Sequence, residues 1–190
     1  MNQQSSATGT PNLGEGPDLR LVVGMVHKTA IAEEGVALPL WMAVALDADD
    51  CPAALGLYRE TPTVGDLMML LGDGPADADG LGPQWTCRAA AAVIVDHAVL
   101  WQAHAMRGWL AERGTAVYAQ SPAGPDRQRV QQSFSAIARS IGAAIKRGAA
   151  GRDANGAALV TPEDAVAATR EWRAAIDAEV EASKLGQMSR

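Results

Sequence analysis

Aromatic residues, cysteines and histidines are all scarce in this chain. Aromatics make up 4% of its 190 residues, although hydrophobic residues as a whole reach 48%. Ala, Val, Leu and Ile carry most of the apolar fraction, and an alanine-rich chain with few aromatic residues favours helices over sheets. The length and the hydrophobic content suffice for one compact domain with a sizeable core, and two small helical subdomains are the alternative.

The chain also lacks a cysteine metal motif, a secretion signal and a membrane span. Its two cysteines, Cys51 and Cys87, are far apart in sequence, which is typical of buried thiols in a reducing compartment. Residues 1–16 are polar, without the cationic start and apolar run of a signal peptide. No stretch of about 20 apolar residues is free of charge. We therefore expect a cytoplasmic protein that does not contact membranes.

Positive charge is scarce overall but concentrated in one segment. The formal net charge is −6, and an acidic chain is not typical of bulk nucleic-acid binding. Residues 1–80 carry a net charge of −9, whereas residues 126–152 carry +5. One basic segment is therefore set in an acidic protein. This uneven distribution of charge says more about possible interaction surfaces than the total charge does.

Shifts in composition divide the chain into segments. Residues 1–17 are rich in Ser, Thr, Gly, Asn, Gln and Pro, which predicts a disordered tail. Residues 73–82 combine glycine and proline with acids, which predicts a linker. The linker separates an N-terminal helical segment, residues 18–72, from a C-terminal helical segment, residues 83–185. The two segments form either separate subdomains or one domain.

Helical spacing of apolar residues recurs along the chain. Thr63 and Asp66 form a capping-box pattern, and Thr161 followed by Pro162 is a strong helix start. We expect an all-α fold, an irregular bundle of about five to seven helices, with an α+β fold carrying a small N-terminal sheet as the alternative. Residues 19–27 are compatible with a strand as well. The predicted helices cover 18–34, 39–46, a short stretch after Pro52, a stretch from Thr63 to Gly72, 83–113, 126–147 and 162–184.

The most apolar stretch of the chain contains an acid and two histidines. On a helix with about 100° per residue, Asp96, His97, His104 and Arg107 share one sector while the other directions are apolar, as in a buried helix. The histidines are seven residues apart, about 10 Å along the axis, which is too far for one metal ion. We interpret this polar seam, residues 96–107, as interhelical hydrogen bonding, with a catalytic or ligand-binding site as the alternative.

Residues 127–147 form an amphipathic helix pattern with a basic outer face. Such a face contacts phosphates, docks on an acidic surface that includes the N-terminal part of this chain, or is simply solvated. Within it, FSAIARSIG (residues 134–142) resembles the first helix and turn of a helix-turn-helix. The resemblance implies a second helix over 144–152. Gly148 and Gly151 lie in this range, and glycine destabilises the interior of a helix. The basic residues of the face are Arg129, Arg139, Lys146 and Arg147.

The stretch DANG, residues 153–156, is similar to part of a calcium loop between two helices. Aligned on Gly156, Asp153 and Asn155 match ligand positions, but Gly151 and Pro162 occupy the first and last positions. We interpret the stretch as an Asn-Gly turn before a capped helix. No metal and no cofactor are expected.

The function that these patterns favour is non-catalytic. We expect a helical interaction or assembly protein of a bacterium or its phage, with a protein partner or self-association. The first alternative is a nucleic-acid-binding regulator that uses the basic helix at 127–147. The second alternative is a ligand-binding or enzymatic helical bundle that uses the polar seam at 96–107.

Overall fold

The fold is α+β. The computed structural model describes residues 18–72, 81–87, 90–95, 100–119 and 125–188, and these form four helices and an eight-stranded mixed sheet. The expected all-α bundle, and with it the description of the protein as helical, is wrong, and the α+β alternative is right. The predicted tail and most of the predicted linker lie outside the described residues, and the segments on either side of the linker supply strands to the same sheet.

The N-terminal segment is an antiparallel meander instead of a set of helices. It consists of β1 (Asp18–Glu33), β2 (Val36–Leu46) and β3 (Pro52–Tyr58). The helices predicted over 18–34, over 39–46 and after Pro52 are therefore wrong, whereas the strand alternative for 19–27 is right. Both faces of this sheet are covered, so β2 is an unbroken apolar run that periodicity cannot distinguish from a buried helix.

The helix predicted over 83–113 is also wrong, because this region forms two strands and a shorter helix. These elements are β4 (Gly82–Trp85), β5 (Ala92–Val95) and α2 (Leu100–Ala111). After α2 comes β6 (Ala116–Ala119), and the strand order is β4-β3-β2-β1-β5-β6, with β5 and β6 parallel to β1. The short hairpin of β7 (Gly151–Arg152) and β8 (Ala158–Val160) joins β1 through β8.

Strand β1 is bent by a bulge in its middle. Its register with β2 shifts between Met25 and Ala30, and Lys28 takes a left-handed backbone conformation with φ of 51°. The half of β1 before the bulge pairs with β5, and the half after it pairs with β8. A bulge leaves an unpaired residue and bends the strand, so one strand serves two different neighbours on the same side.

Two of the helices, α1 (Val64–Leu70) and α4 (Pro162–Met188), begin where local capping signals predict them. In α1, the Thr63 hydroxyl accepts a bond from the backbone N–H of Asp66 at 3.3 Å, and the carboxylate of Asp66 accepts from the backbone N–H of Thr63 at 2.7 Å. In α4, the Thr161 hydroxyl accepts from the N–H of Asp164 at 3.1 Å. The helices predicted after Thr63, over 126–147 and from Pro162 are confirmed, the second as α3 (Pro125–Lys146).

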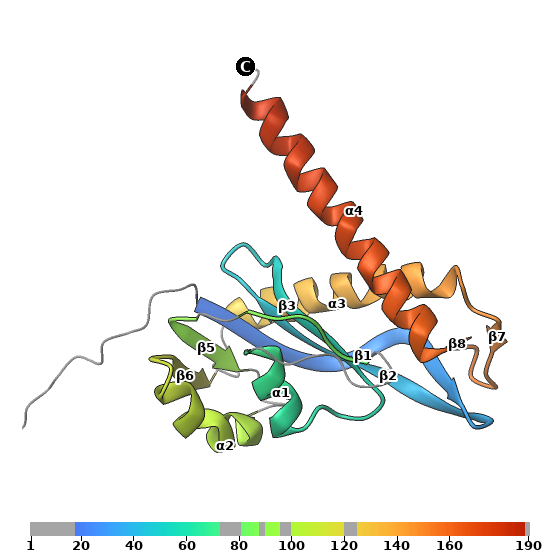
Figure 1. Ribbon diagram of the computed structural model, residues 1–190, viewed down its shortest axis with the longest axis horizontal. Helices are drawn as coiled ribbons and strands as arrows, with labels where there is room; N and C mark the ends of the chain where they lie inside the picture. Colours follow the sequence, from blue (N-terminus) through green and yellow to red (C-terminus); the bar gives the residue numbers. More distant parts are fainter. Residues whose placement is uncertain (1–17, 73–80, 88–89, 96–99, 120–124, 189–190) are drawn as a thin grey trace, which may run out of the picture.

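The sheet separates two hydrophobic cores. Figure 1 shows α1 and α2 on one side of the sheet and α3 on the other, with α4 crossing α3 and leaving the body. Successive residues of a strand point to opposite faces, so Val22 and Met42 enter the α3 core whereas Leu21 and Ala43 enter the α1–α2 core. The sheet is therefore a central layer, which explains why β2 shows no alternation of polar and apolar residues.

Tyr58 is a buried tyrosine whose hydroxyl has no hydrogen-bond partner in the described structure. Its ring lies over Gly56, where a Cβ atom would collide with the Tyr58 hydroxyl. Burial, and secondly the charge of Asp66, raise the pKa of Tyr58 above the value usual for tyrosine. The hydroxyl therefore favours its protonated form in the folded protein, without contributing a hydrogen bond to stability.

We expect Tyr58→Phe to keep or raise the free energy of unfolding at neutral pH by up to about 1 kcal/mol, because it removes an unsatisfied buried hydroxyl. In the wild type, the raised pKa means that the folded state retains this proton at a pH where the unfolded state loses it. Titration of Tyr58 therefore leaves the free energy of unfolding unchanged below about pH 10. Above that pH it lowers the free energy of unfolding by up to about 1.4 kcal/mol per pH unit. Tyr58→Phe should remove this decline.

Urea unfolding at a series of pH values between neutral and about pH 11 measures the difference. Tyr118→Phe is the matched control, since Tyr118 is 52% exposed and its change should leave the alkaline decline intact. The assignment is contradicted if Tyr58→Phe and the wild type lose stability equally above pH 10.

Candidate functional site

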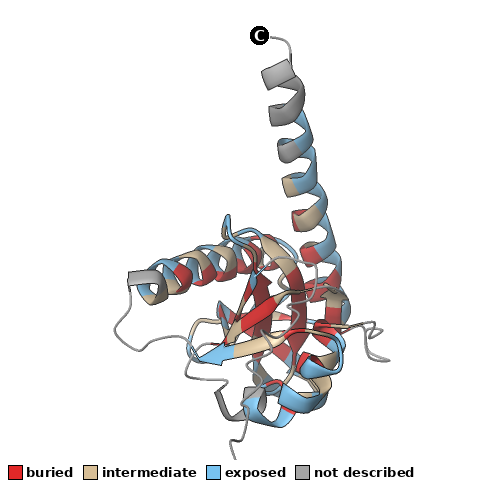
Figure 2. Ribbon diagram, turned by 90° about the vertical axis from the view of Figure 1, so that its left-hand side faces the viewer, coloured by how far each residue is buried: buried red, intermediate tan, exposed pale blue. Residues whose placement is uncertain are grey.

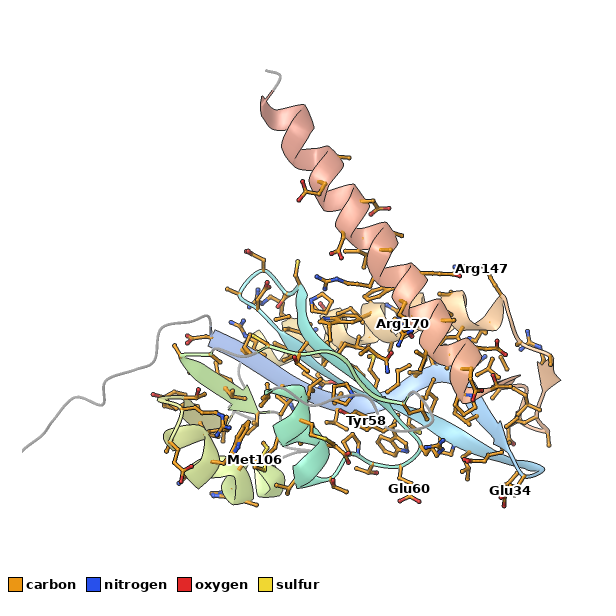
Figure 3. The ribbon with its side chains drawn as sticks, viewed as in Figure 1. Glu34, Tyr58, Glu60, Met106, Arg147 and Arg170 are labelled. Atoms are coloured by element: carbon orange, nitrogen blue, oxygen red, sulfur yellow. The ribbon has the colours of Figure 1, made fainter. Side chains whose placement is uncertain are left out.

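The predicted polar seam does not lie on a buried helix. Asp96 and His97 are outside the described residues. His104 and Arg107 lie on α2, and both are exposed. The buried side of α2 contains Met106, which packs in the core beneath the sheet (Figure 3). α2 is thus a surface helix with one buried side, and the part of the seam that the structure describes faces solvent.

The basic face of α3 divides into an internal ion pair and exposed cations. The guanidinium of Arg129 lies 3.2 Å from the carboxylate of Asp50 and 3.5 Å from the carbonyl oxygen of Ala48. Arg129 therefore docks on the acidic N-terminal part of the chain, one of the three uses predicted for this face. Arg139, in contrast, is exposed and forms no ion pair within the described residues.

Four cations gather where α3 ends, and we call this group the cationic surface: Lys28, Lys146, Arg147 and Arg152. Partial burial, then the charge of Lys28, then that of Arg152 lower the pKa of Lys146. None of the four forms an ion pair with an acidic residue in the described ranges. Arg152 donates to the carbonyl oxygen of Gly156 at 2.8 Å, which holds it within the β7–β8 hairpin.

The cationic surface is assembled by tertiary structure. The bulge of β1 presents Lys28, the last turn of α3 and the residue after it present Lys146 and Arg147, and β7 presents Arg152. Sequence reasoning identified the two cations of α3, because they share a helix face. It missed the other two, because no local pattern marks them. Figure 3 shows Arg147 on the α3 side of the sheet, opposite Met106.

The resemblance to a helix-turn-helix is not realised. α3 continues through Gly142 to Lys146, so the residue that would make the turn lies inside a helix. Residues 144–152 then hold the end of α3 and β7 instead of a recognition helix. Gly142 is needed for another reason: a Cβ at this position would lie 3.0 Å from the backbone carbonyl oxygen of His27 in the bulge of β1.

The stretch DANG forms a turn, as we interpreted it, and not a calcium loop. The carboxylate of Asp153 accepts bonds from the backbone N–H groups of Asn155 at 2.9 Å and Ala157 at 2.7 Å. Gly156 has a φ of 76°, which glycine tolerates without strain. Among the described residues, no three or more His, Cys, Asp or Glu side chains are grouped so that they could hold a metal ion.

The first half of α4 packs on the body, whereas the described side chains of its distal half are exposed. Thr169 and Trp172 are buried against the rest of the protein, and the indole N–H of Trp172 donates to the hydroxyl of Ser140 at 2.8 Å. Among the residues of the helix whose side chains the structure describes, Ile176 is the last partly buried hydrophobic one. Beyond it, every side chain that the structure describes is exposed, and Figure 2 shows this part of α4 standing clear of the sheet.

No protein-family model and no curated protein matches this chain. None of the helices in the described ranges is both long enough and apolar enough to cross a membrane. The features that bear on function are therefore physical ones: a cationic surface without an acidic partner among the described residues, and a helix whose described distal side chains are exposed and partly acidic.

Proposed function

We propose that this protein is a non-catalytic assembly protein whose copies associate through α4. The observation that carries the proposal is the distal half of α4, residues 177–188, in which the described side chains, at 177–179 and 181–182, are exposed. This segment spans about 18 Å at 1.5 Å per residue. In proteins, most of the stability of a helix comes from packing one of its faces against another element. A surface that covers this segment would therefore stabilise it.

The occupant that we propose is a second copy of the chain. In the sequence of residues 177–188, Asp177, Glu179 and Glu181 stand against a single lysine, Lys184, which leaves a net charge of −2. Asp177 is bound to Arg173 of the same helix. The cationic surface carries four positive charges without an acidic partner in the described structure. Because α4 points away from its own body (Figure 1), its acids complement the cations of another copy. Two copies related by a two-fold axis would make this contact twice.

The association should be measured by sedimentation of the full chain over a range of concentrations. We expect a dimer that dissociates as salt is added, because exposed charge pairs are screened. Lys146→Glu with Arg147→Glu, or Glu179→Lys with Glu181→Lys, should raise the dissociation constant by about tenfold or more, equivalent to 1.4 kcal/mol. Combining both pairs of reversals should restore the dimer, since the charges then match again.

Arg107→Glu is the control, because Arg107 is exposed on α2, away from both surfaces, and its reversal should not change the dimer. A monomer at every concentration tested would contradict the proposal, as would reversals that fail to rescue each other. Tight binding of short duplex DNA at low salt, lost in Lys146→Glu with Arg147→Glu, would assign the cationic surface to nucleic acid and overturn the proposal.

A further inference from the structure

A separate cleft lies at the base of α4, where the helix passes the edge strand β4. Its volume is about 530 Å³, within the range of clefts that hold small molecules. It combines an indole ring with two guanidinium groups, one carboxylate, one amide and one hydroxyl. The residues that supply these groups are Gln84, Trp85, Thr86, Arg170, Arg173 and Asp177.

The indole of Trp85 is held in place from three directions. Its ring stacks on Trp172 with a centroid separation of 6.3 Å and an interplanar angle of 21°. Its N–H donates to the carbonyl oxygen of Pro52 at 3.3 Å. The guanidinium of Arg173 lies over the ring, 4.9 Å from its centroid. The apolar wall of the cleft is therefore already rigid before anything binds.

Arg173 is oriented by hydrogen bonds to α4 and to the first residue of β3. Its Nε donates to the carboxylate of Asp177 at 2.9 Å, and one terminal nitrogen donates to the carbonyl oxygen of Pro52 at 3.0 Å. A guanidinium has five N–H donors, so donors remain for a further acceptor. Because the Arg173 side chain is already ordered, less side-chain conformational entropy is lost when a ligand binds.

Arg170 lies one turn earlier on α4 and lines the same cleft. It is exposed and forms no ion pair or hydrogen bond within the described ranges; Figure 3 shows its position on α4. Two guanidinium groups against the single carboxylate of Asp177 leave one uncompensated positive charge in the cleft. Guanidinium groups bind carboxylate and phosphate oxygens in a planar, two-pronged geometry.

We propose that this cleft binds a small organic anion, with its phosphate or carboxylate group between Arg170 and Arg173 and a flat apolar group beside Trp85. The site shares Asp177 with the acidic segment of α4, but it uses neither the cationic surface nor Glu179 and Glu181, the acids that the self-association test reverses. Phosphate and carboxylate share the chemistry that Arg170 and Arg173 recognise, and the choice of probe distinguishes them.

Calorimetric titration of the full chain tests the site with four probes: adenosine monophosphate, adenosine, inorganic phosphate and benzoate. We expect adenosine monophosphate or benzoate to bind at least tenfold more tightly than adenosine or inorganic phosphate, because only the first two combine an anion with a ring. Preference between these two identifies the phosphate or the carboxylate as the group bound.

Arg170→Ala should weaken the binding at least tenfold, and Arg170→Lys should weaken it less, because a lysine keeps the charge but loses the planar geometry. Arg139→Ala, which removes an exposed arginine from α3, is the matched control and should bind as the wild type does. Circular dichroism checks that each variant is folded. Absence of binding by all four probes, or equal binding by Arg170→Ala and Arg139→Ala, would overturn the proposal.

Discussion

Replacing Phe134 by alanine is expected to lower the free energy of unfolding by about 3–5 kcal/mol. Phe134 is the one phenylalanine in the chain, and it is 7% exposed. It belongs to the core between α3 and the sheet, and its ring covers Gly24 of β1 so closely that a Cβ there would lie 2.8 Å from two ring carbons. Removing the ring therefore leaves a cavity over a residue that has no side chain to fill it.

A double-mutant cycle with Gly24→Ala tests this contact directly. In the wild type, Gly24→Ala should destabilise, because the new methyl group collides with the Phe134 ring. In Phe134→Ala the ring is absent, so the same change should be neutral or stabilising, and the two effects should not add. Urea unfolding measures all four proteins, with Ser135→Ala on the exposed side of α3 as the control. A loss below about 1 kcal/mol for Phe134→Ala, or strict additivity, would contradict the described packing.

Gly142→Leu is expected to destabilise the protein by about 2–3 kcal/mol, because a side chain at this residue of α3 would overlap the bulge of β1. The nearest atoms to a Cβ at 142 are the His27 carbonyl oxygen at 3.0 Å and a Val26 methyl carbon at 3.4 Å. The first is backbone and cannot rotate away. The helix-forming gain of leucine over glycine, about 0.8 kcal/mol, is too small to offset this overlap.

Gly108→Leu is the matched control for this prediction. Gly108 also lies inside a helix, α2, but among the described residues no atom beyond its own neighbourhood in the helix lies within 4 Å of the position where its Cβ would be. The same substitution there should be neutral or should raise stability by about 0.8 kcal/mol. Thermal or urea unfolding compares the two variants. Equal effects at both positions would show that helix propensity alone decides the result, and would contradict the close approach of α3 to β1.

At Gly142 the sequence pattern identifies a position that requires glycine, but it gives the wrong structural reason for that requirement. Its position after Ala138 in FSAIARSIG resembles the turn of a helix-turn-helix, in which glycine frees the backbone to change direction. In the structure, glycine is required instead because a neighbouring strand leaves no room for a side chain. Both explanations favour glycine at the same site, and only the packing of β1 distinguishes them.

The candidate sites could be predicted only in part, for a related reason. Lys146 and Arg147 were found because they share one face of an amphipathic helix. Lys28 and Arg152 join them through a strand bulge and a hairpin, neither of which has a local signature. In the cleft, Arg173 donates to the carbonyl oxygen of a residue 121 positions away in the chain, and no spacing rule reaches across that distance.

The sequence by itself determined where the helices with strong local signals begin. Thr63 and Thr161 cap their helices through bonds to residues three positions later, and the apolar face of α3 repeats with the helical period, so these features need no tertiary context. Tertiary structure decided the rest. β2 is apolar on both faces, which a buried helix would be as well, and only its pairing in a sheet that is covered on both sides makes it a strand.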